Sequence, residues 1–127
     1  MATRSAIGIV ESDGSVNAIY CHWDGDVDGV GQTLVRFYHN LYLASELIDM
    51  GDASSIGSSV FHSDFYYRDR KEPATSVQSK YFPNVADFLA HYSENWCQYF
   101  YLYIGNEWQY SVNDLNGFKP VPMSVGA

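Results

Sequence analysis

The chain opens with a β-hairpin signal at residues 5–21, which read SAIGIVESDGSVNAIYC. Two apolar runs flank Asp13-Gly14, and glycine accepts the positive φ that a two-residue hairpin turn needs. A turn of this length would pair Ile9 with Ala18. Both alternating sets of side chains in these runs are apolar, so either face of the strand pair is a candidate for burial.

The rest of the chain alternates between helical and strand patterns. The expected elements are helices over 30–40 and 42–50 and from Asn84, strands over 60–67 and 75–81, and a closing hairpin of 97–104 and 107–112. Its register would place Tyr103 opposite Trp108 and Tyr101 opposite Tyr110. We therefore predict a single α+β domain over residues 1–127. Its mainly antiparallel sheet would be built from hairpins, with about three helices packed on one face.

Composition limits the classes of partner. Hydrophobic residues make up 46% of the chain, enough for a packed core, and the formal net charge is −8. An acidic protein is repelled by nucleic-acid phosphate and by anionic membranes, so we expect neither as a partner. The two cysteines are too few for a disulfide framework, and neither a signal peptide nor a membrane-spanning run is evident. We expect a cytoplasmic protein.

Residues 20–25, which read YCHWDG, concentrate chemically useful side chains at the end of the second strand. A zinc site would need Cys21 and His22 on one ion, but adjacent strand residues point to opposite faces. The series Asp-x-Asp-x-Asp-Gly at 24–29 opens a calcium loop, yet its twelfth position is Val35 instead of a bidentate glutamate. We therefore expect no metal and no cofactor.

His22 and Asp24 fall on the same face if the strand continues, which allows an imidazole–carboxylate pair. Such a pair can activate a nucleophile, and it can equally satisfy the polar groups at a strand end. No nucleophile motif surrounds Cys21. The structural pairing is therefore favoured, and no catalytic residue is assigned.

A basic cluster interrupts the acidic sequence. Arg68, Arg70 and Lys71 place three of the seven basic residues within four positions. A local cationic spot concentrates small anions while large polyanions are still repelled, and guanidinium groups suit phosphate and carboxylate. The alternative is a solvated turn in which the arginines pair with Asp69 and Glu72, because exposed ion pairs are common and weak.

A resemblance is carried by short segments along most of the chain: 1–5, 19–25, Gly31 with Leu34, 47–48, 51–52, 67–70 and the helix near Phe88. They resemble a family of small uncharacterised bacteriophage proteins, whose most specific element is the core Cys-His-Trp-Asp-Gly. Members usually carry an aromatic residue after that glycine, where this chain has Asp26. The resemblance implies a phage accessory protein in the host cytoplasm, with inhibition of host defence as its expected role.

We expect a non-enzymatic protein that sequesters a small, anionic, nucleotide-like signalling molecule. The expected ligand-binding residues are Arg4, Arg68 and Arg70 for phosphate, Trp23, Tyr67 and Tyr101 for stacking on a base, and His22 and Asp24 for its polar edges. Homo-oligomers commonly build such pockets at their interfaces, so we expect a dimer or a larger assembly.

Two alternatives stay open. The first is an inhibitor that binds a host defence protein through the tyrosine-rich face of the closing hairpin, because Tyr and Trp are favoured interface anchors. The second is a small hydrolase that uses His22.

Overall fold

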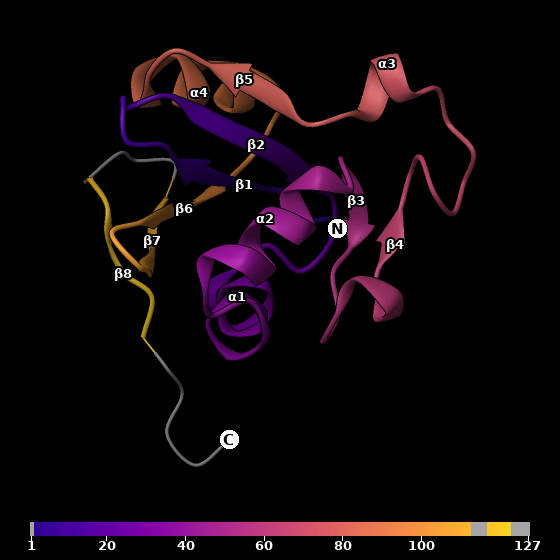
Figure 1. Cartoon of the computed structure of the whole chain (residues 1–127), viewed down its shortest axis with the longest axis horizontal. Coiled ribbons are helices and arrows are strands. Elements are labelled where there is room, and N and C mark those ends of the chain that lie inside the picture. The colour runs from indigo at the N-terminus through magenta and orange to yellow at the C-terminus, as the bar shows by residue number, and fades with distance from the viewer. Residues whose placement is uncertain (1, 113–116, 123–127) are drawn as a thin grey trace.

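The computed structural model describes residues 2–112 and 117–122, and their centre is a mixed sheet of eight strands (Figure 1). The strands are β1 (Ser5–Val10), β2 (Val16–Cys21), β3 (Ala53–Ser55), β4 (Asp64–Phe65), β5 (Lys80–Phe82), β6 (Tyr99–Ile104), β7 (Glu107–Val112) and β8 (Lys119–Pro120). Their order is β4-β3-β2-β1-β6-β7-β8, and β5 also pairs with β2. Most neighbours are antiparallel, but β1 with β6 and β2 with β3 are parallel. The predicted α+β class with a mostly antiparallel sheet is confirmed.

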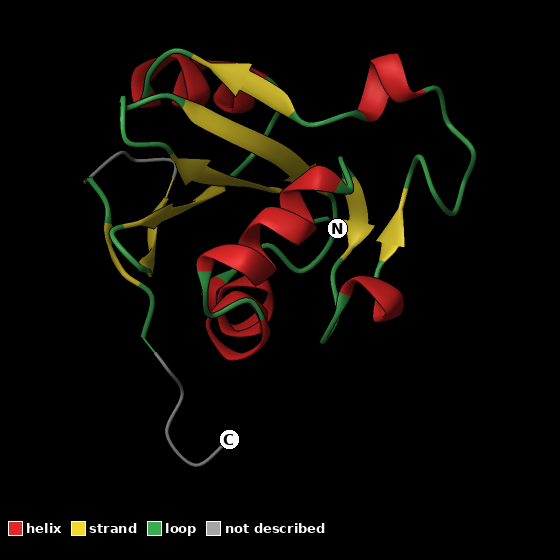
Figure 2. Cartoon of the chain, in the orientation of Figure 1, coloured by secondary structure: helices red, strands yellow, loops and turns green. Residues whose placement is uncertain are grey.

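Helices pack on both faces of this sheet, so the expectation that they would share one face was wrong (Figures 1 and 2). The helical segments are η1 (Val27–Gly31), α1 (Gln32–Phe37), α2 (Leu41–Asp49), η2 (Val60–His62), α3 (Ala74–Val77) and α4 (Val85–Glu94). One core joins Ile7 of β1 to Leu34 and Leu47 of α1 and α2. The other joins Ala6 to Phe88 of α4. Two faces are covered because both alternating sets of β1 side chains are apolar.

The first hairpin forms where expected, but its register differs by one residue. Ile9 pairs with Asn17, not with Ala18. The loop holds three residues, because the Glu11 N–H donates to the Ser15 carbonyl and Gly14 takes the left-handed conformation at φ 87°. A third loop residue with positive φ is a common hairpin solution. The shift brings Ile7 and Ile19 opposite each other, on the face that α2 covers.

The middle of the chain departs most from expectation. The predicted strand over 60–67 is mainly the turn η2 followed by the two-residue strand β4. The guanidinium of Arg68 explains this, because it binds the carbonyls of Val60 and Ser63 that a strand ladder would otherwise use. The predicted strand over 75–81 divides into the short helix α3 and β5, and β5 pairs with β2.

The closing hairpin has the predicted register, with Tyr103 opposite Trp108 and Tyr101 opposite Tyr110. Its tyrosine-rich face is buried: Tyr101 is 0% exposed, and both Tyr103 and Trp108 belong to the core under α1 and α2. The Trp108 indole donates to the carbonyl of Tyr38 at 2.8 Å. This face therefore supports the fold and offers no broad surface to a partner.

Asparagine side chains cap two helices, and the cap at Asn84 was predicted. Asn84 accepts from the Asp87 N–H at 2.7 Å, which fixes the start of α4, and Asn40 accepts from the Leu43 N–H at the start of α2. Within residues 2–112 and 117–122, no helix is long and apolar enough to cross a membrane.

Candidate functional site

The end of β2 carries a ring cluster. The hydroxyl of Tyr20 lies 2.7 Å from Nδ1 of His22, and the His22 ring meets the edge of Trp23 with 4.7 Å between centroids. Trp23 is 44% exposed, so one part of its indole is held by neighbours and another faces solvent. Cys21 points the other way, into the core, as the alternation along a strand requires.

The positive charges of two arginine side chains affect the protonation of His22 in this ring cluster. Burial lowers the pKa of His22, and the charges of Arg4 and Arg70 lower it further. Arg70 donates to the hydroxyl of Ser54 at 3.2 Å, while the N–H of Trp23 donates to the Ser54 carbonyl at 3.0 Å. A cation from the turn after β4 is thereby brought beside the end of β2.

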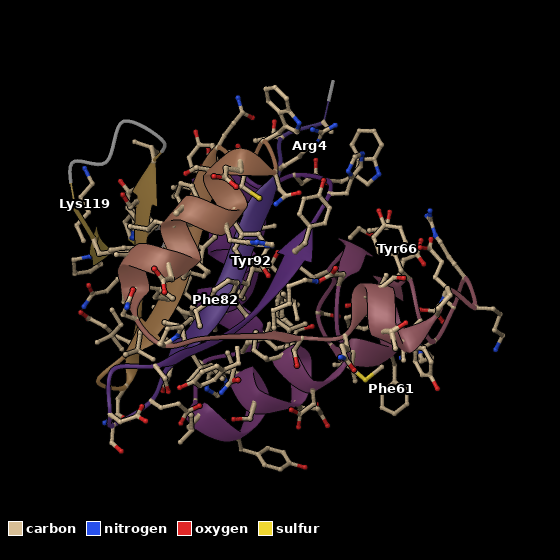
Figure 3. The ribbon with its side chains drawn as sticks, turned by 90° about the horizontal axis from the view of Figure 1, so that it is seen from above. Arg4, Phe61, Tyr66, Phe82, Tyr92 and Lys119 are labelled. Carbon is tan, nitrogen blue, oxygen red and sulfur yellow. The ribbon has the colours of Figure 1, made fainter. Side chains whose placement is uncertain are left out.

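Arg4 reaches the same place from the N-terminal segment. The carbonyl of Thr3 accepts from the Gly25 N–H at 2.8 Å, and the Arg4 carbonyl accepts from the Gln98 N–H at 2.9 Å. Figure 3 shows Arg4 at one end of the molecule, well apart from Lys119. Its Nε is buried and has no hydrogen-bond partner within the described chain. We call Arg4, His22, Trp23 and Arg70 the hairpin-end site.

Arg68 does not belong to this site. Its guanidinium donates to the carbonyls of Val60 and Ser63 and to the carboxylate of Asp69, and it lies over the Phe65 ring. The pairing with Asp69 was one of the two interpretations of the basic cluster. Arg70 pairs with Asp64 at 2.6 Å instead of with Glu72. Arg68 therefore stabilises its own loop through four hydrogen bonds.

The positions of Tyr101 and Asp24 do not fit the roles expected for them, which were stacking on a base and binding its polar edges. The Tyr101 hydroxyl donates to the Gly25 carbonyl at 2.7 Å from a fully buried position, so the ring cannot stack on a ligand. Asp24 has φ 58° and lines a separate hollow with Asp26 and Asp28. This left-handed residue ends the strand alternation on which a pair with His22 depended. Tyr67 is 55% exposed on the turn after β4.

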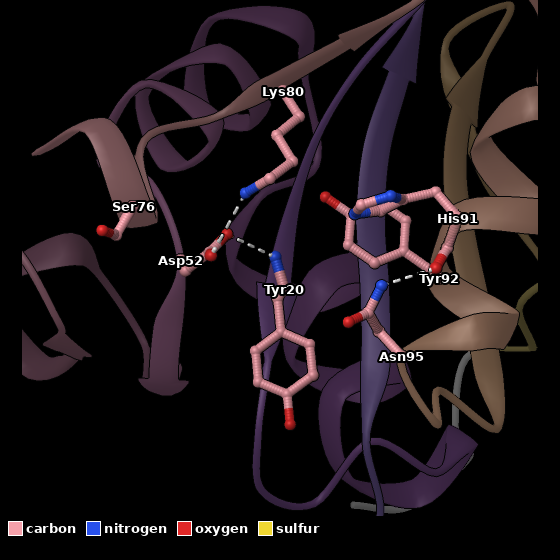
Figure 4. Close-up of a pocket in the computed structure, with 7 residues that line it drawn as sticks. All are labelled: Tyr20, Asp52, Ser76, Lys80, His91, Tyr92 and Asn95. Carbon is pink, nitrogen blue, oxygen red and sulfur yellow. Dashed lines mark hydrogen bonds and ion pairs between the residues drawn. The ribbon is translucent and has the colours of Figure 1, made fainter.

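A cavity beside β2 was not predicted from the sequence. It has a volume of about 390 Å³ and is lined by Tyr20, Asp52, Ser76, Lys80, His91, Tyr92 and Asn95 (Figure 4). We call these residues the Asp52 pocket. The loop before β3, β5 and α4 bring these residues together.

Asp52 is the charged group of this pocket, and it is only 9% exposed. Its Oδ1 accepts from the Tyr20 N–H at 2.9 Å, and its Oδ2 lies 3.8 Å from Nζ of Lys80. Burial raises the pKa of Asp52 to about 6, against the opposing effects of the Tyr20 N–H and the Lys80 charge. The carboxylate is thus held in a partly dehydrated place with one oxygen free of short hydrogen bonds.

Tyr92 faces Asp52 from α4. It is 2% exposed, and its hydroxyl has no hydrogen-bond partner within the described chain. Burial raises the pKa of this hydroxyl, and the Asp52 charge raises it further. In Figure 4 the hydroxyl points away from α4 toward the side of the pocket that holds Lys80 and Asp52. A buried polar atom without a partner is rare and calls for an explanation.

Neither place has the donor set of a metal centre: in the part of the chain that the structure describes, no three His, Cys, Asp or Glu side chains gather to hold an ion. Burial raises the pKa of Cys21 to about 12, which keeps that thiol protonated near neutral pH. Comparison of the chain with known protein families, with curated proteins and with solved structures found no match.

Proposed function

We propose that the protein binds a small, anionic, nucleotide-like molecule at the hairpin-end site and holds it without turnover. One observation carries the proposal: the segments that hold Arg4 and Arg70, far apart in the sequence, are both hydrogen-bonded to the stretch around the half-exposed indole of Trp23, through Thr3 to Gly25 and through Ser54 to Trp23. Two cations next to an accessible aromatic face suit a ligand that combines phosphate with a planar ring.

The charges favour a small anion. The chain as a whole has a formal net charge of −8, so a long polyanion is repelled while a small one can enter a local cationic spot. Arg4 has a buried Nε without a partner, and an incoming phosphate oxygen would satisfy it. The ion pair of Arg70 with Asp64 is exposed, and an exposed pair is weak enough to exchange for a phosphate.

The rings favour binding over chemistry. The edge contact with His22 fixes the orientation of Trp23, which lowers the entropy that stacking on a base would lose. Among the described residues no hydrogen bond joins His22 to Asp24, and Cys21 is buried with its thiol protonated. These features support a holding role for the site and give a hydrolase no activated nucleophile.

The biological part of the proposal rests on the resemblance to small phage proteins. A phage accessory protein that captures a nucleotide-like signal would prevent the host from responding to it, which is how we propose that this chain counters defence. The proposal includes a homo-oligomer in the host cytoplasm. The exposed apolar side chains Phe37, Leu41 and Tyr42 at the turn from α1 to α2 support self-association, and sedimentation of the purified chain measures it.

Calorimetry with cyclic oligonucleotides and ADP-ribose derivatives tests the proposal. We expect one ligand class to bind, and Trp23→Ala and Arg70→Gln each to weaken binding by about tenfold or more. The matched controls are Tyr81→Ala, which removes another exposed ring, and Lys119→Gln, which removes a cation far from Arg4. Chromatography of the bound ligand after long incubation should recover it unchanged. Silence across the panel from a folded protein contradicts the proposal.

A further inference from the structure

We infer that the Asp52 pocket is a second recognition site, built for the vicinal hydroxyl pair of a sugar. The inference is argued from the pocket alone and does not depend on what the hairpin-end site binds. It starts from two buried groups, the Asp52 carboxylate and the Tyr92 hydroxyl, that the protein itself leaves incompletely hydrogen-bonded.

The Tyr92 hydroxyl needs a partner from outside the chain. It is almost fully buried, its oxygen has no partner among the described residues, and it points into the pocket (Figure 4). A buried hydroxyl without a partner loses the hydrogen bonds that it made to water in the unfolded chain. A ligand oxygen that accepts from Tyr92 would restore one of them.

The Asp52 carboxylate needs a donor. Its Oδ1 accepts from the Tyr20 N–H, whereas Oδ2 lies 3.8 Å from Lys80, beyond hydrogen-bond length. A ligand O–H placed between them would donate to Oδ2 and accept from the Lys80 ammonium. The ligand must therefore present both donors and acceptors within a short distance, and two neighbouring hydroxyl groups do so.

The charges of the pocket select a neutral ligand. Asp52 repels phosphate or carboxylate, and Lys80 repels an ammonium group. A simple anion or a simple cation would therefore be attracted by one of these two side chains and repelled by the other. The side chains of Ser76 and Asn95 add further polar atoms at the wall. Tyr20 also lines the pocket. Its aromatic ring can pack against the apolar C–H face of a sugar.

The size of the pocket fits one monosaccharide unit. A volume of about 390 Å³ lies near the lower end of the range for small-molecule sites. Three separate elements contribute to the walls: Asp52 follows α2, Lys80 begins β5, and Tyr92 lies in α4. Because the sheet and α4 fix these three groups, the site is formed before any ligand arrives.

A titration followed by amide NMR tests this inference with two probes, methyl β-D-ribofuranoside and its 2-deoxy analogue. For the wild-type chain we expect the riboside to shift the amide signals of Tyr20, Lys80 and Tyr92, and the deoxy analogue to bind at least about tenfold more weakly. Equal binding of the two probes, or no shift at these amides with the riboside, overturns the inference without any mutation.

Two variants locate the binding. Asp52→Asn and Tyr92→Phe should each weaken riboside binding by about tenfold, because each removes one side of the diol contact. The matched controls are Asp87→Asn and Tyr81→Phe, whose side chains are exposed, and Trp23→Ala, which belongs to the hairpin-end site. All three should bind the riboside as the wild type does. Retained affinity in both pocket variants, or loss in Trp23→Ala alone, overturns the assignment.

Discussion

The backbone N–H of Tyr20 donates a 2.9 Å hydrogen bond to Oδ1 of Asp52, which joins the second strand to the connection after α2. The hydroxyl of the same tyrosine lies 2.7 Å from Nδ1 of His22. Tyr20 therefore lines the Asp52 pocket, and its hydroxyl reaches the hairpin-end site. Two candidate binding places share one wall, and changes at Tyr20 will affect both.

Asp52 makes the stability of the protein depend on pH. Its pKa is about 6 in the folded chain against an ordinary value of 3.8, mainly because the carboxyl is buried. The folded state thus binds the proton more tightly than the unfolded chain, so the contribution of Asp52 to stability is greatest below about pH 4 and is lost as the pH rises through about 6.

Asp52→Asn should remove this loss while it keeps an acceptor for the Tyr20 N–H. Relative to the wild type, we expect the unfolding free energy of the variant to gain on the order of 2 kcal/mol between about pH 4 and pH 7.5. Urea denaturation at both pH values measures it, with exposed Asp87→Asn as the control for removing one charge. If the unfolding free energies of the wild type and Asp52→Asn change by the same amount between these two pH values, the buried Asp52 carboxylate is not the cause of the pH dependence.

Arg68 and Arg70 should separate stability from binding, although only one residue stands between them. Arg68→Ala frees the carbonyls of Val60 and Ser63, and we expect a loss of about 1–2 kcal/mol in unfolding free energy with ligand affinity unchanged. Arg70→Ala breaks an exposed ion pair, so we expect a smaller stability change and a clear loss of ligand affinity. Denaturation and calorimetry on the same preparations measure both quantities. A larger loss of affinity in Arg68→Ala than in Arg70→Ala would contradict the assignment of Arg70 to the hairpin-end site.

The hydroxyl of Tyr101 should matter for folding alone. Tyr101→Phe removes the 2.7 Å hydrogen bond to the Gly25 carbonyl and leaves that acceptor without its partner, which should cost about 1–2 kcal/mol. Thermal or chemical denaturation measures the loss. Ligand affinity should stay at the wild-type value because the ring is fully buried. Weaker binding at unchanged stability would restore the stacking role first expected for this residue.

The two cysteines should resist alkylation in the native protein. Both are buried, and burial raises the pKa of Cys21 and of Cys97 to about 12, so little thiolate is present at pH 8. Iodoacetamide should leave the folded chain unmodified and label both thiols in denaturant, as intact-mass measurements will show. Rapid labelling of Cys21 under native conditions would reopen its use as a nucleophile.

Local chemistry was readable from the sequence. Asp13-Gly14 marked the first turn, Asn84 marked the start of α4, and the pairing of Tyr103 with Trp108 followed from the spacing around the last turn. Each of these features depends on residues that are close together in the chain. The register of the first hairpin was missed because the same two turn residues also fit a three-residue loop.

Long-range packing was not readable. The apolar residues of β1 permit burial on two faces, but the sequence of β1 does not indicate which helix packs on each face. Asp52 sits in a small polar segment and Tyr92 in an amphipathic stripe, so neither carried a signal of its own. They meet only because β5 returns to pair with β2 and α4 packs on the opposite face from α2.

The central strand β1 also sets the order in which the sheet can be completed. Its antiparallel partner β2 follows at once, whereas its parallel partner β6 begins only at Tyr99. A chain leaving the ribosome can therefore form the first strand pair early, but it keeps one long edge of β1 open until β6 has been synthesised. Fragments that stop before Tyr99 retain that open edge permanently, which makes them candidates for edge-to-edge aggregation.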